Sequence, residues 1–497
     1  MKGSSWSRGL VVTADGEGVV SHAGLAVLRL LADRSGLTGR LSGALATPRL
    51  LVHDRGRVVA DMACAIADGA RAISDCRVLC DQQELFGPVA SVPTMWRTLE
   101  EVGAGGQRTQ TRLTTAVNKA RAWAWDQVEA RHGGISPLRV ADKTLPGVIG
   151  IRLDATVTPA HSEKEGAEPN FKGFGHHPLL SYCDNTGEPL AGLFRKGSAG
   201  SNTAADHIEV LDAAIAALPA RYRRRLVVTT DGAGASHELV SHLDKLAARP
   251  GHQLVYSVGW DFADRERVAV GRVPEQAWQT AIDPDGAPRR RRADDACDDA
   301  RCAHQRCWRA QAQVTELTGL LRGHRAGDRL AGWPASMRVF ARRERPHPGA
   351  QLSLFEQADG WRYSLWATNL PERTRGWRAQ TAYVDAAHRV HARVEDRIRT
   401  GKDTGISRFP SHSMAMNSAW LATALMATTL LSWLALIALD GELARAEPKT
   451  LRYRFLHTAA RLTSSGRQRH LKISRTWPWA TDIAHAWTQI NDLPQAP

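Results

Sequence analysis

The sequence predicts an α/β fold whose sheet is built from the middle of the chain. Residues 147–160, GVIGIRLDATVTPA, alternate apolar and polar side chains with the period of two that is typical of a half-buried strand. Residues 177–184 and 188–197 give two further strand patterns, and the turn residues between them predict a hairpin. Helix and strand patterns then alternate, as they do in α/β sheets. The helices are expected over 203–220 and 236–248, and the strands over 224–231 and 252–260.

The region before this sheet is expected to be mainly helical. Residues 23–36 and 58–73 carry apolar side chains at helical spacing. The glycine-containing stretch GAGGQRTQTR, residues 103–112, is expected to form a hinge or linker between this region and the sheet.

Residues 85–103 predict a pair of short helices. The first is followed by a turn at Val92-Pro93, and the second is expected to be capped by Thr94. A helix-turn-helix that presents Arg97 to a DNA groove fits this stretch, and so does a helical hairpin of the core. The sequence leaves both interpretations open.

The region after the sheet breaks the alternation of helix and strand. Short β-like pieces separated by turns predict a mostly β insertion over residues 263–378. A helical pattern returns at about residue 380 and includes Glu395. The β-like pieces of the insertion are 336–344, 350–357 and 361–370.

Composition favours a DNA-binding protein of several domains. At 497 residues the chain is long enough for about two to four domains. A formal net charge of +14 and a pI near 9.8 favour a polyanionic partner, with nucleic acid ahead of a membrane surface. The N-terminus has no apolar core followed by a cleavage site, so no secretory signal is expected.

The cysteines indicate a reducing compartment. Seven cysteines, an odd number scattered over a long chain, do not form a disulfide framework, so a cytoplasmic location is expected. Within the segment RRRRADDACDDARCAHQRC, which is expected to be a solvated loop, four residues have the types of a zinc site but a spacing that matches no zinc finger. They are Cys297, Cys302, His304 and Cys307.

One long apolar stretch has two interpretations. Residues 419–439, AWLATALMATTLLSWLALIAL, carry no charge and are long enough to cross a bilayer. They also contain serine, threonine and much alanine, and no second span accompanies them, which favours a helix buried in a large core. A DNA-processing function requires the buried helix and no membrane partner.

Three carboxylates are the candidate catalytic residues. Asp154 lies on the polar side of one predicted strand, and Asp231 lies at the carboxyl end of another, where α/β sheets bind ligands. Glu395 lies in HARVEDRIRTGKDTG, where the alternative is a solvated helix with ion pairs. Brought together, these three residues would bind two Mg²⁺ or Mn²⁺ ions for phosphodiester cleavage, because carboxylate oxygens suit these ions.

Helical spacing adds candidate phosphate-binding groups to Glu395. At about 3.6 residues per turn, several basic side chains are expected on the same helix face as Glu395, where they would donate to DNA phosphates. They are His388, His391, Arg399 and Lys402.

At these residues the chain resembles DDE transposases of bacterial insertion sequences, in the insertion-sequence family numbered thirteen-eighty, which is related to piggyBac elements. The resemblance covers most of the chain, and five stretches carry it in order. They are DATVTPAHSEKEGAEPNFKGFGHHPL, NTAADHIEVLDAA, TTDGAGASH, RPHPGAQLSLFEQADGWRY and HARVEDRIRTGKDTG.

The resemblance implies an RNase H-like core interrupted by a β-rich insertion between the second aspartate and the glutamate. By match, Asp154, Asp231 and Glu395 are the metal-binding triad. The family's Tyr, Arg, Glu, Lys signature on the glutamate helix has two, three and six intervening residues, and this spacing falls on His388, His391, Glu395 and Lys402. The two histidines depart from the signature, so their contact with the DNA end requires protonated rings.

Further DNA contacts are expected around the core. The resemblance implies a tryptophan of the insertion that stacks on a flipped base, and core packing is the alternative for both candidates, Trp361 and Trp366. Basic residues beside the predicted sheet could follow the DNA backbone or be ordinary surface. They are Lys164, Lys172, Arg195 and Lys196.

Together these observations predict a cut-and-paste DNA transposase that acts as a homodimer on paired element ends. The resemblance implies hairpin ends and a TTAA target. A nuclease without strand transfer and a domesticated DNA-binding repressor are the alternatives. The expected domains are a helical DNA-binding region (1–145), the first core part (146–262), the insertion (263–378), the second core part (379–440) and a helical, basic DNA-contacting tail (441–497).

Overall fold

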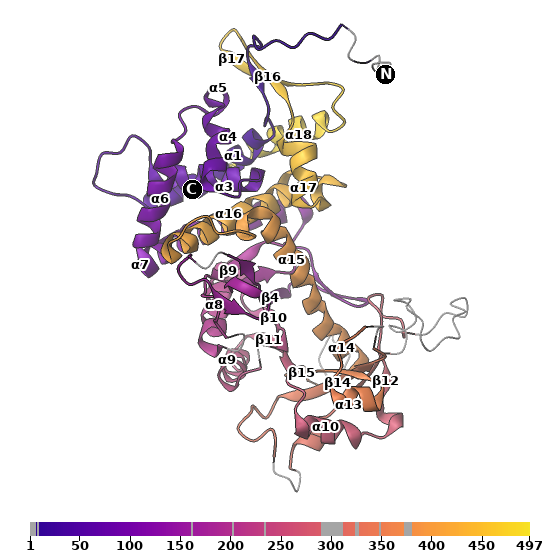
Figure 1. The fold of residues 1–497 in the computed structure, drawn as a ribbon. Coiled ribbons are helices and arrows are strands. Elements are labelled where there is room, and N and C mark those ends of the chain that lie inside the picture. The colour runs from indigo at the N-terminus through magenta and orange to yellow at the C-terminus, as the bar shows by residue number, and fades with distance from the viewer. Residues whose placement is uncertain are drawn as a thin grey trace, which may run out of the picture.

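A large mixed sheet forms the centre of the molecule in the computed structural model (Figure 1). Within the part of the chain that the structure describes, its order is β12-β13-β14-β15-β11-β10-β4-β8-β9. Strands β4, β10 and β11 are parallel, and the other neighbours are antiparallel. The bounds are β4 Ile149–Ala155, β8 Leu179–Cys183, β9 Pro189–Leu193, β10 Arg225–Thr230, β11 Gln253–Trp260, β12 Gln279–Thr280, β13 Gln313–Glu316, β14 Arg338–Glu344 and β15 Arg362–Thr368.

The structure describes most of the chain and leaves out the candidate zinc residues. Cys297, Cys302, His304 and Cys307 lie outside the described residues. The described residues are 6, 9–160, 163–200, 203–232, 235–289, 312–323, 328–346, 349–371 and 380–497.

The predicted α/β fold and its strands are confirmed in the centre of the sheet. The β8–β9 hairpin forms as expected, with Leu179 beside Leu193. Strand β4 keeps the predicted alternation, but both of its faces are covered, so even Arg152 on the polar side is buried. The prediction of a half-buried strand is therefore wrong, because a helical segment packs over the polar face.

Strands from the predicted insertion extend the same sheet. β15 pairs antiparallel with β11, and β14 pairs antiparallel with the other edge of β15. The strand expected at 350–357 is wrong, because α13 (Leu354–Asp359) occupies this position. A capping box starts that helix: Glu356 N donates to Ser353 Oγ, and Ser353 N donates to a Glu356 carboxylate oxygen 2.9 Å away.

Helices cover the two faces of the sheet. The apolar face of β4 packs with α8 and α9 in one core cluster. The opposite face is covered by α14 and α15, which are joined by a short 3₁₀ turn, η6. The bounds are α8 Ala204–Ala217, α9 His237–Ala247, α10 Asp264–Gly271, α12 Thr318–Leu321, α14 Thr381–Arg389, η6 Val390–Ala392 and α15 Arg393–Gly401.

Helices from both ends of the chain pack together at one end of the molecule (Figure 1). The apolar helix α16 (Met414–Ala438) runs through this unit and contacts α3, α6 and α7. Its length and apolar composition would allow it to cross a membrane. However, 72% of its most apolar 18-residue stretch is buried inside the protein. This packing is that of a core helix, which is the favoured interpretation of residues 419–439. The other helices are α1 Leu25–Arg34, α2 Leu37–Ala44, α3 Arg55–Asp68, α4 Arg77–Cys80, α5 Gln83–Phe86, α6 Val92–Ala104, α7 Gly106–His132, α17 Pro448–Leu451 and α18 Ala480–Asp492.

Two predictions in the N-terminal region are wrong. Helix α6 begins at Val92 after Ser91, so the expected turn at Val92-Pro93 is instead the first helical turn, which tolerates proline. The hinge expected at 103–112 is also absent, because α7 follows α6 directly after Gly105. α6 packs on α16 and α3 as a helix of the core, while Arg97 remains exposed on its outer side.

The C-terminal region contains strands as well as helices. β16 (Ala460–Ser465) and β17 (Gln468–Ile473) form a hairpin, and β1 (Val19–Val20) pairs with β16. The C-terminal region was expected to be helical, and besides its helices it contains this hairpin, which the sequence analysis did not predict. Smaller strand pairs near the core are β2 Leu138–Val140 with β3 Lys143–Leu145, and β7 Gly173–His176 with both β5 Thr158–Pro159 and β6 Glu168–Asn170.

Candidate active site

The sheet brings Asp154 and Asp231 to the same edge. In the parallel pair β4–β10, Leu153 lies beside Thr230. Asp154 is the next residue of β4, and Asp231 directly follows the end of β10, so the two are neighbours where the strands lie about 4.8 Å apart. Asp154 is half-buried and Asp231 is exposed.

A glycine in the third parallel strand positions the Asp231 loop. Gly259 N donates to Asp231 O at 3.1 Å. A Cβ at Gly259 would lie only 2.3 Å from Gly232 N. Sequence analysis missed Gly259, although an isolated glycine inside a strand is a signal for close backbone approach.

Hydrogen bonds fix the helical segment that carries Glu395 across the polar face of the sheet. His388 Nδ1 and Ser257 Oγ of β11 are 2.8 Å apart. His391 Nδ1 and Thr229 Oγ1 of β10 are 3.0 Å apart. The segment thus passes from β11 over β10 toward β4, which α15 contacts.

An ion-pair network beneath α15 completes this anchoring. Arg393 of α15 donates to Asp184 Oδ2 at 2.9 Å, and Arg152 of β4 donates to the same oxygen at 3.0 Å. Arg152 also donates to Thr229 Oγ1 at 2.8 Å. Sequence analysis missed Arg152 and Asp184, although Arg152 precedes Asp154 by two residues on the same side of β4, which was the available signal.

The electrostatics place the three carboxylates in one cluster. The pKa of Asp154 is raised to about 7, first by burial and then by the negative charges of Asp231 and Glu395. The Ala155 backbone amide and Lys172 act in the opposite direction. The oxygens of the three carboxylates do not all lie within 4.8 Å of one another.

This donor set fits divalent cations. Three carboxylates from a strand, a strand end and a covering helix supply only oxygen ligands, which Mg²⁺ and Mn²⁺ prefer. Asp231 and Glu395 both act on Asp154 as negative charges, which a bound cation would neutralise.

Two predicted lysines lie beside the carboxylates. Lys402 Nζ donates to Val157 O at 3.2 Å, and burial followed by Lys172 lowers its pKa. Lys172 is exposed and close enough to Asp154 to favour its ionised form. Lys164 lies apart from them, because its ammonium group donates to Phe409 O.

The predicted common helix face is wrong for His388 and His391. The 3₁₀ turn η6 between α14 and α15 changes the helical phase, so both histidines face the sheet, whereas Glu395 is exposed. Burial lowers the pKa of each ring to about 3. Neutral rings bonded to Ser257 and Thr229 do not provide the protonated phosphate contacts that were expected.

The two candidate base-stacking tryptophans have different environments. Trp366 is 1% exposed and stacks on His388, with ring centroids 5.2 Å apart. The base-stacking interpretation is therefore wrong for Trp366, because its faces are already covered by protein. Trp361 is half-buried between the guanidinium groups of Arg343 and Arg345, and its DNA role stays a prediction.

The remaining basic candidates differ in exposure. Arg195 is 4% exposed and donates to Asp206 and to the His177 carbonyl, so it is a buried structural residue and not a DNA-backbone contact. Arg399 is on the surface, where it pairs with Asp396 and Glu447. Lys196 is also exposed.

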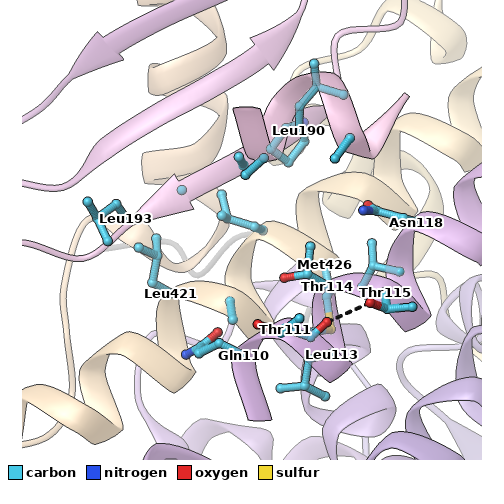
Figure 2. A pocket seen from close by; sticks show the side chains of 18 of the residues that line it. Gln110, Thr111, Leu113, Thr114, Thr115, Asn118, Leu190, Leu193, Leu421 and Met426 are labelled. Carbon is cyan, nitrogen blue, oxygen red and sulfur yellow. Dashed lines mark hydrogen bonds between the residues drawn. The ribbon is translucent and has the colours of Figure 1, made fainter. Parts of the chain in front are cut away.

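A separate cavity is lined by other residues than the candidate carboxylates. A cavity of about 390 Å³ opens among α7, α8, β9 and α16. Figure 2 shows the polar side chains of Gln110 and Thr111 near the apolar Leu421, and that of Asn118 on the other side of the pocket. None of the three candidate carboxylates lines it.

Comparisons with known proteins show the family of the chain. Among solved structures, the chain is similar to a cryo-EM structure of a piggyBac transposase synaptic complex with hairpin DNA, at 10% sequence identity and a TM-score of 0.39, over 88% of this chain and 80% of that chain. No protein of curated function matches it. The family model described as Transposase DDE domain group 1 matches residues 4–495, nearly the whole chain. The chain therefore belongs to the DDE transposase family.

Proposed function

We propose that the chain is a cut-and-paste DNA transposase that cleaves the ends of its element and joins them to target DNA. One observation carries the proposal: in a chain of this family, Asp154, Asp231 and Glu395 share one electrostatic cluster at the carboxyl edge of the sheet. Two acidic residues from neighbouring parallel strands and a third from a covering helix support an RNase H-like core. The strand order β9-β8-β4-β10-β11 supports it too.

The finer features of the proposal rest on the resemblance in sequence motifs. They are membership of the insertion-sequence family numbered thirteen-eighty, hairpin ends, a TTAA target, action as a homodimer on DNA, and a location in the bacterial cytoplasm.

The three carboxylates have distinct tasks in the proposed reaction. A pair of divalent ions bound by them would activate the attacking oxygen and stabilise the leaving oxygen of a phosphodiester displacement. Asp154 holds a proton for part of the time near neutral pH, so it must release that proton to act as a ligand. Glu395 sits on a helix held rigidly by its bonds to the sheet, which keeps its carboxylate in place.

Lysines beside the cluster would hold the DNA strand. Lys172 is exposed next to the carboxylates, and the Lys402 ammonium lies by the Val157 carbonyl on the same side of the sheet. Both can bind phosphate oxygens flanking the cleaved bond. Arg399 lies further along α15 on the surface and can extend this contact once it leaves Asp396.

Cleavage of DNA that carries the element's terminal repeats, in the presence of Mg²⁺, tests the proposal. We expect Glu395→Gln to lower the cleavage rate by a factor on the order of 100 or more, because loss of one electrostatic contributor to a transition state costs about 3–4 kcal/mol. Asp396→Asn is the matched control, since this residue is exposed on the same helix and pairs only with Arg399 among the described residues. Equal rates for Glu395→Gln and the parent would refute the proposal.

Pre-cleaved ends then separate transposition from simple cutting. A transposase joins such ends to a target plasmid, and joining should be lost in Asp231→Asn. A chain that cuts but never joins is a nuclease, and a chain that binds the repeats without cutting is a repressor. Either outcome would replace the proposed function.

A further inference from the structure

A second group of metal-ligating side chains lies outside the carboxylate cluster. The ring nitrogens of His22 and His457 and the carboxylate of Asp68 all lie within 4.8 Å of one another. His22 Nδ1 is 2.7 Å from Asp68 Oδ2, and His457 Nε2 is 3.3 Å from Asp68 Oδ1. The two imidazole rings are 4.5 Å apart between centroids.

This geometry suits a small transition-metal ion. Bonds of about 2 Å in a tetrahedral site separate neighbouring ligand atoms by about 3.3 Å, which matches the spacing of His457 Nε2 and Asp68 Oδ1. The 2.7 Å contact of His22 Nδ1 with Asp68 Oδ2 would lengthen when an ion enters between them. The two oxygens of the buried Asp68 carboxylate each hold one ring, Oδ2 contacting His22 Nδ1 and Oδ1 contacting His457 Nε2. Two imidazole nitrogens gathered on one carboxylate form a donor set that suits a transition-metal ion.

The accessibility of the group allows an ion to enter. The Asp68 side chain is 4% exposed, while those of His22 and His457 are 23% and 40% exposed. His457 Nε2 also contacts the Asp68 carbonyl at 2.8 Å. A bound ion would replace that contact and require the ring's proton on Nδ1 instead.

We propose that His22, Asp68 and His457 form a binding site for a divalent transition-metal ion, with zinc as the best fit and water in the remaining position. Two imidazoles and one carboxylate favour zinc over Mg²⁺, which prefers oxygen ligands alone. The site is therefore chemically distinct from the all-carboxylate cluster at Asp154.

The position of this site indicates a structural role for the metal ion. His22 follows β1, Asp68 ends α3, and His457 comes just before β16. The first and last of these segments already touch, because Ala23 N donates to Thr458 O at 2.9 Å and β1 pairs with β16.

An ion would therefore fasten the base of the β16–β17 hairpin to α3. That hairpin exposes a row of basic side chains suited to a polyanion. They are Arg461, Arg467, Arg469, His470 and Lys472.

Zinc binding to the full-length chain tests the site. The parent for this experiment carries Cys297→Ser, Cys302→Ser and Cys307→Ser, which removes the three cysteines of the other candidate zinc group, and excess Mg²⁺ competes for the carboxylate cluster. Competition with a chromogenic chelator measures the bound Zn²⁺, and the visible absorption of Co²⁺ reports on its ligands. We expect His457→Gln to lose one equivalent of Zn²⁺ that the parent binds.

His470→Gln on the same hairpin is the matched control and should keep that equivalent. Hydrogen exchange gives a second readout: Zn²⁺ should slow exchange of residues 460–473 in the parent and in His470→Gln, but not in His457→Gln. If His457→Gln does not fold, His22→Gln carries the same test. Equal Zn²⁺ binding by parent and ligand variants, or no Zn²⁺ bound by the parent, would overturn this site. Neither result bears on DNA cleavage.

Discussion

The two neutral histidines under the Glu395 helix should make the core acid-sensitive. His388 and His391 have their pKa lowered to about 3, chiefly by burial, with Arg152 adding to the effect. In the unfolded chain a histidine titrates near 6.5. Below that pH the unfolded chain therefore binds more protons than the folded chain, so stability falls as the pH falls from about 6.5 toward 3.

The size of the effect follows from the shift. Each pH unit in this window costs about 1.4 kcal/mol per histidine, so at pH 5 each ring lowers the free energy of unfolding by about 2 kcal/mol relative to neutral pH. Together His388 and His391 account for about 4 kcal/mol. Burial also lowers the pKa of His176, His177 and His207, which contribute in the same direction.

The test compares the parent with a His388→Asn and His391→Asn double variant. Asparagine keeps a polar atom near the Nδ1 position that bonds Ser257 or Thr229. Urea unfolding at about pH 7.5 and pH 5 gives the stability difference, and hydrogen exchange of residues 381–401 gives a local reading. The variant should be less stable than the parent at neutral pH. Its free energy of unfolding should fall by about 4 kcal/mol less than that of the parent between pH 7.5 and pH 5.

A His412→Asn variant serves as the control, because this histidine is exposed. It should show the full acid sensitivity of the parent. The reasoning is refuted if the double variant and the parent lose the same stability between the two pH values, since the other titrating groups are unchanged.

Four further outcomes are expected. Trp366→Leu should lower the free energy of unfolding by about 3 kcal/mol, because it is fully buried, whereas Trp361→Leu should cost less than about 1 kcal/mol; urea titration compares them. Gly259→Ala should displace the loop that holds the second aspartate and lower DNA cleavage more than overall stability, as paired rate and unfolding measurements would show. Arg121→Met should destabilise the chain by about 3–5 kcal/mol in thermal unfolding, because it leaves the fully buried Glu188 without its cation; adding Glu188→Gln should recover much of this loss. Removal of divalent ions with a chelator should stop cleavage, and Mg²⁺ should restore it; cleavage that persists in chelator would contradict the carboxylate site.

Several features could be predicted because their signals are local. The period-two alternation around Asp154 and the β-branched run before Asp231 identified two strands of the sheet. Because parallel strands end at the same edge of a sheet, the positions of Asp154 and Asp231 near the ends of these strands predicted that the two carboxylates are neighbours. The motifs around them also led to the transposase family that the comparisons show.

Features that depend on long-range contacts could not be predicted. The helix that buries Arg152 comes from more than two hundred residues later in the chain, so a strand pattern alone suggested a half-exposed face. The same holds for Arg195, whose partner Asp206 and burial depend on how α8 packs. Charge in a sequence does not report whether a side chain finds an internal partner.

The sequence by itself determined the strands and helices of the core, the positions of the three acidic residues, and the basic character that suits DNA. The tertiary structure decided which side chains meet: that α15 brings Glu395 to Asp154, that η6 turns His388 and His391 toward the sheet, and that His22, Asp68 and His457 converge. The reason is physical. Secondary structure follows from the pattern of residues that are close in sequence. Which faces of two elements pack together is instead decided by the burial of apolar surface between segments that are distant in the chain.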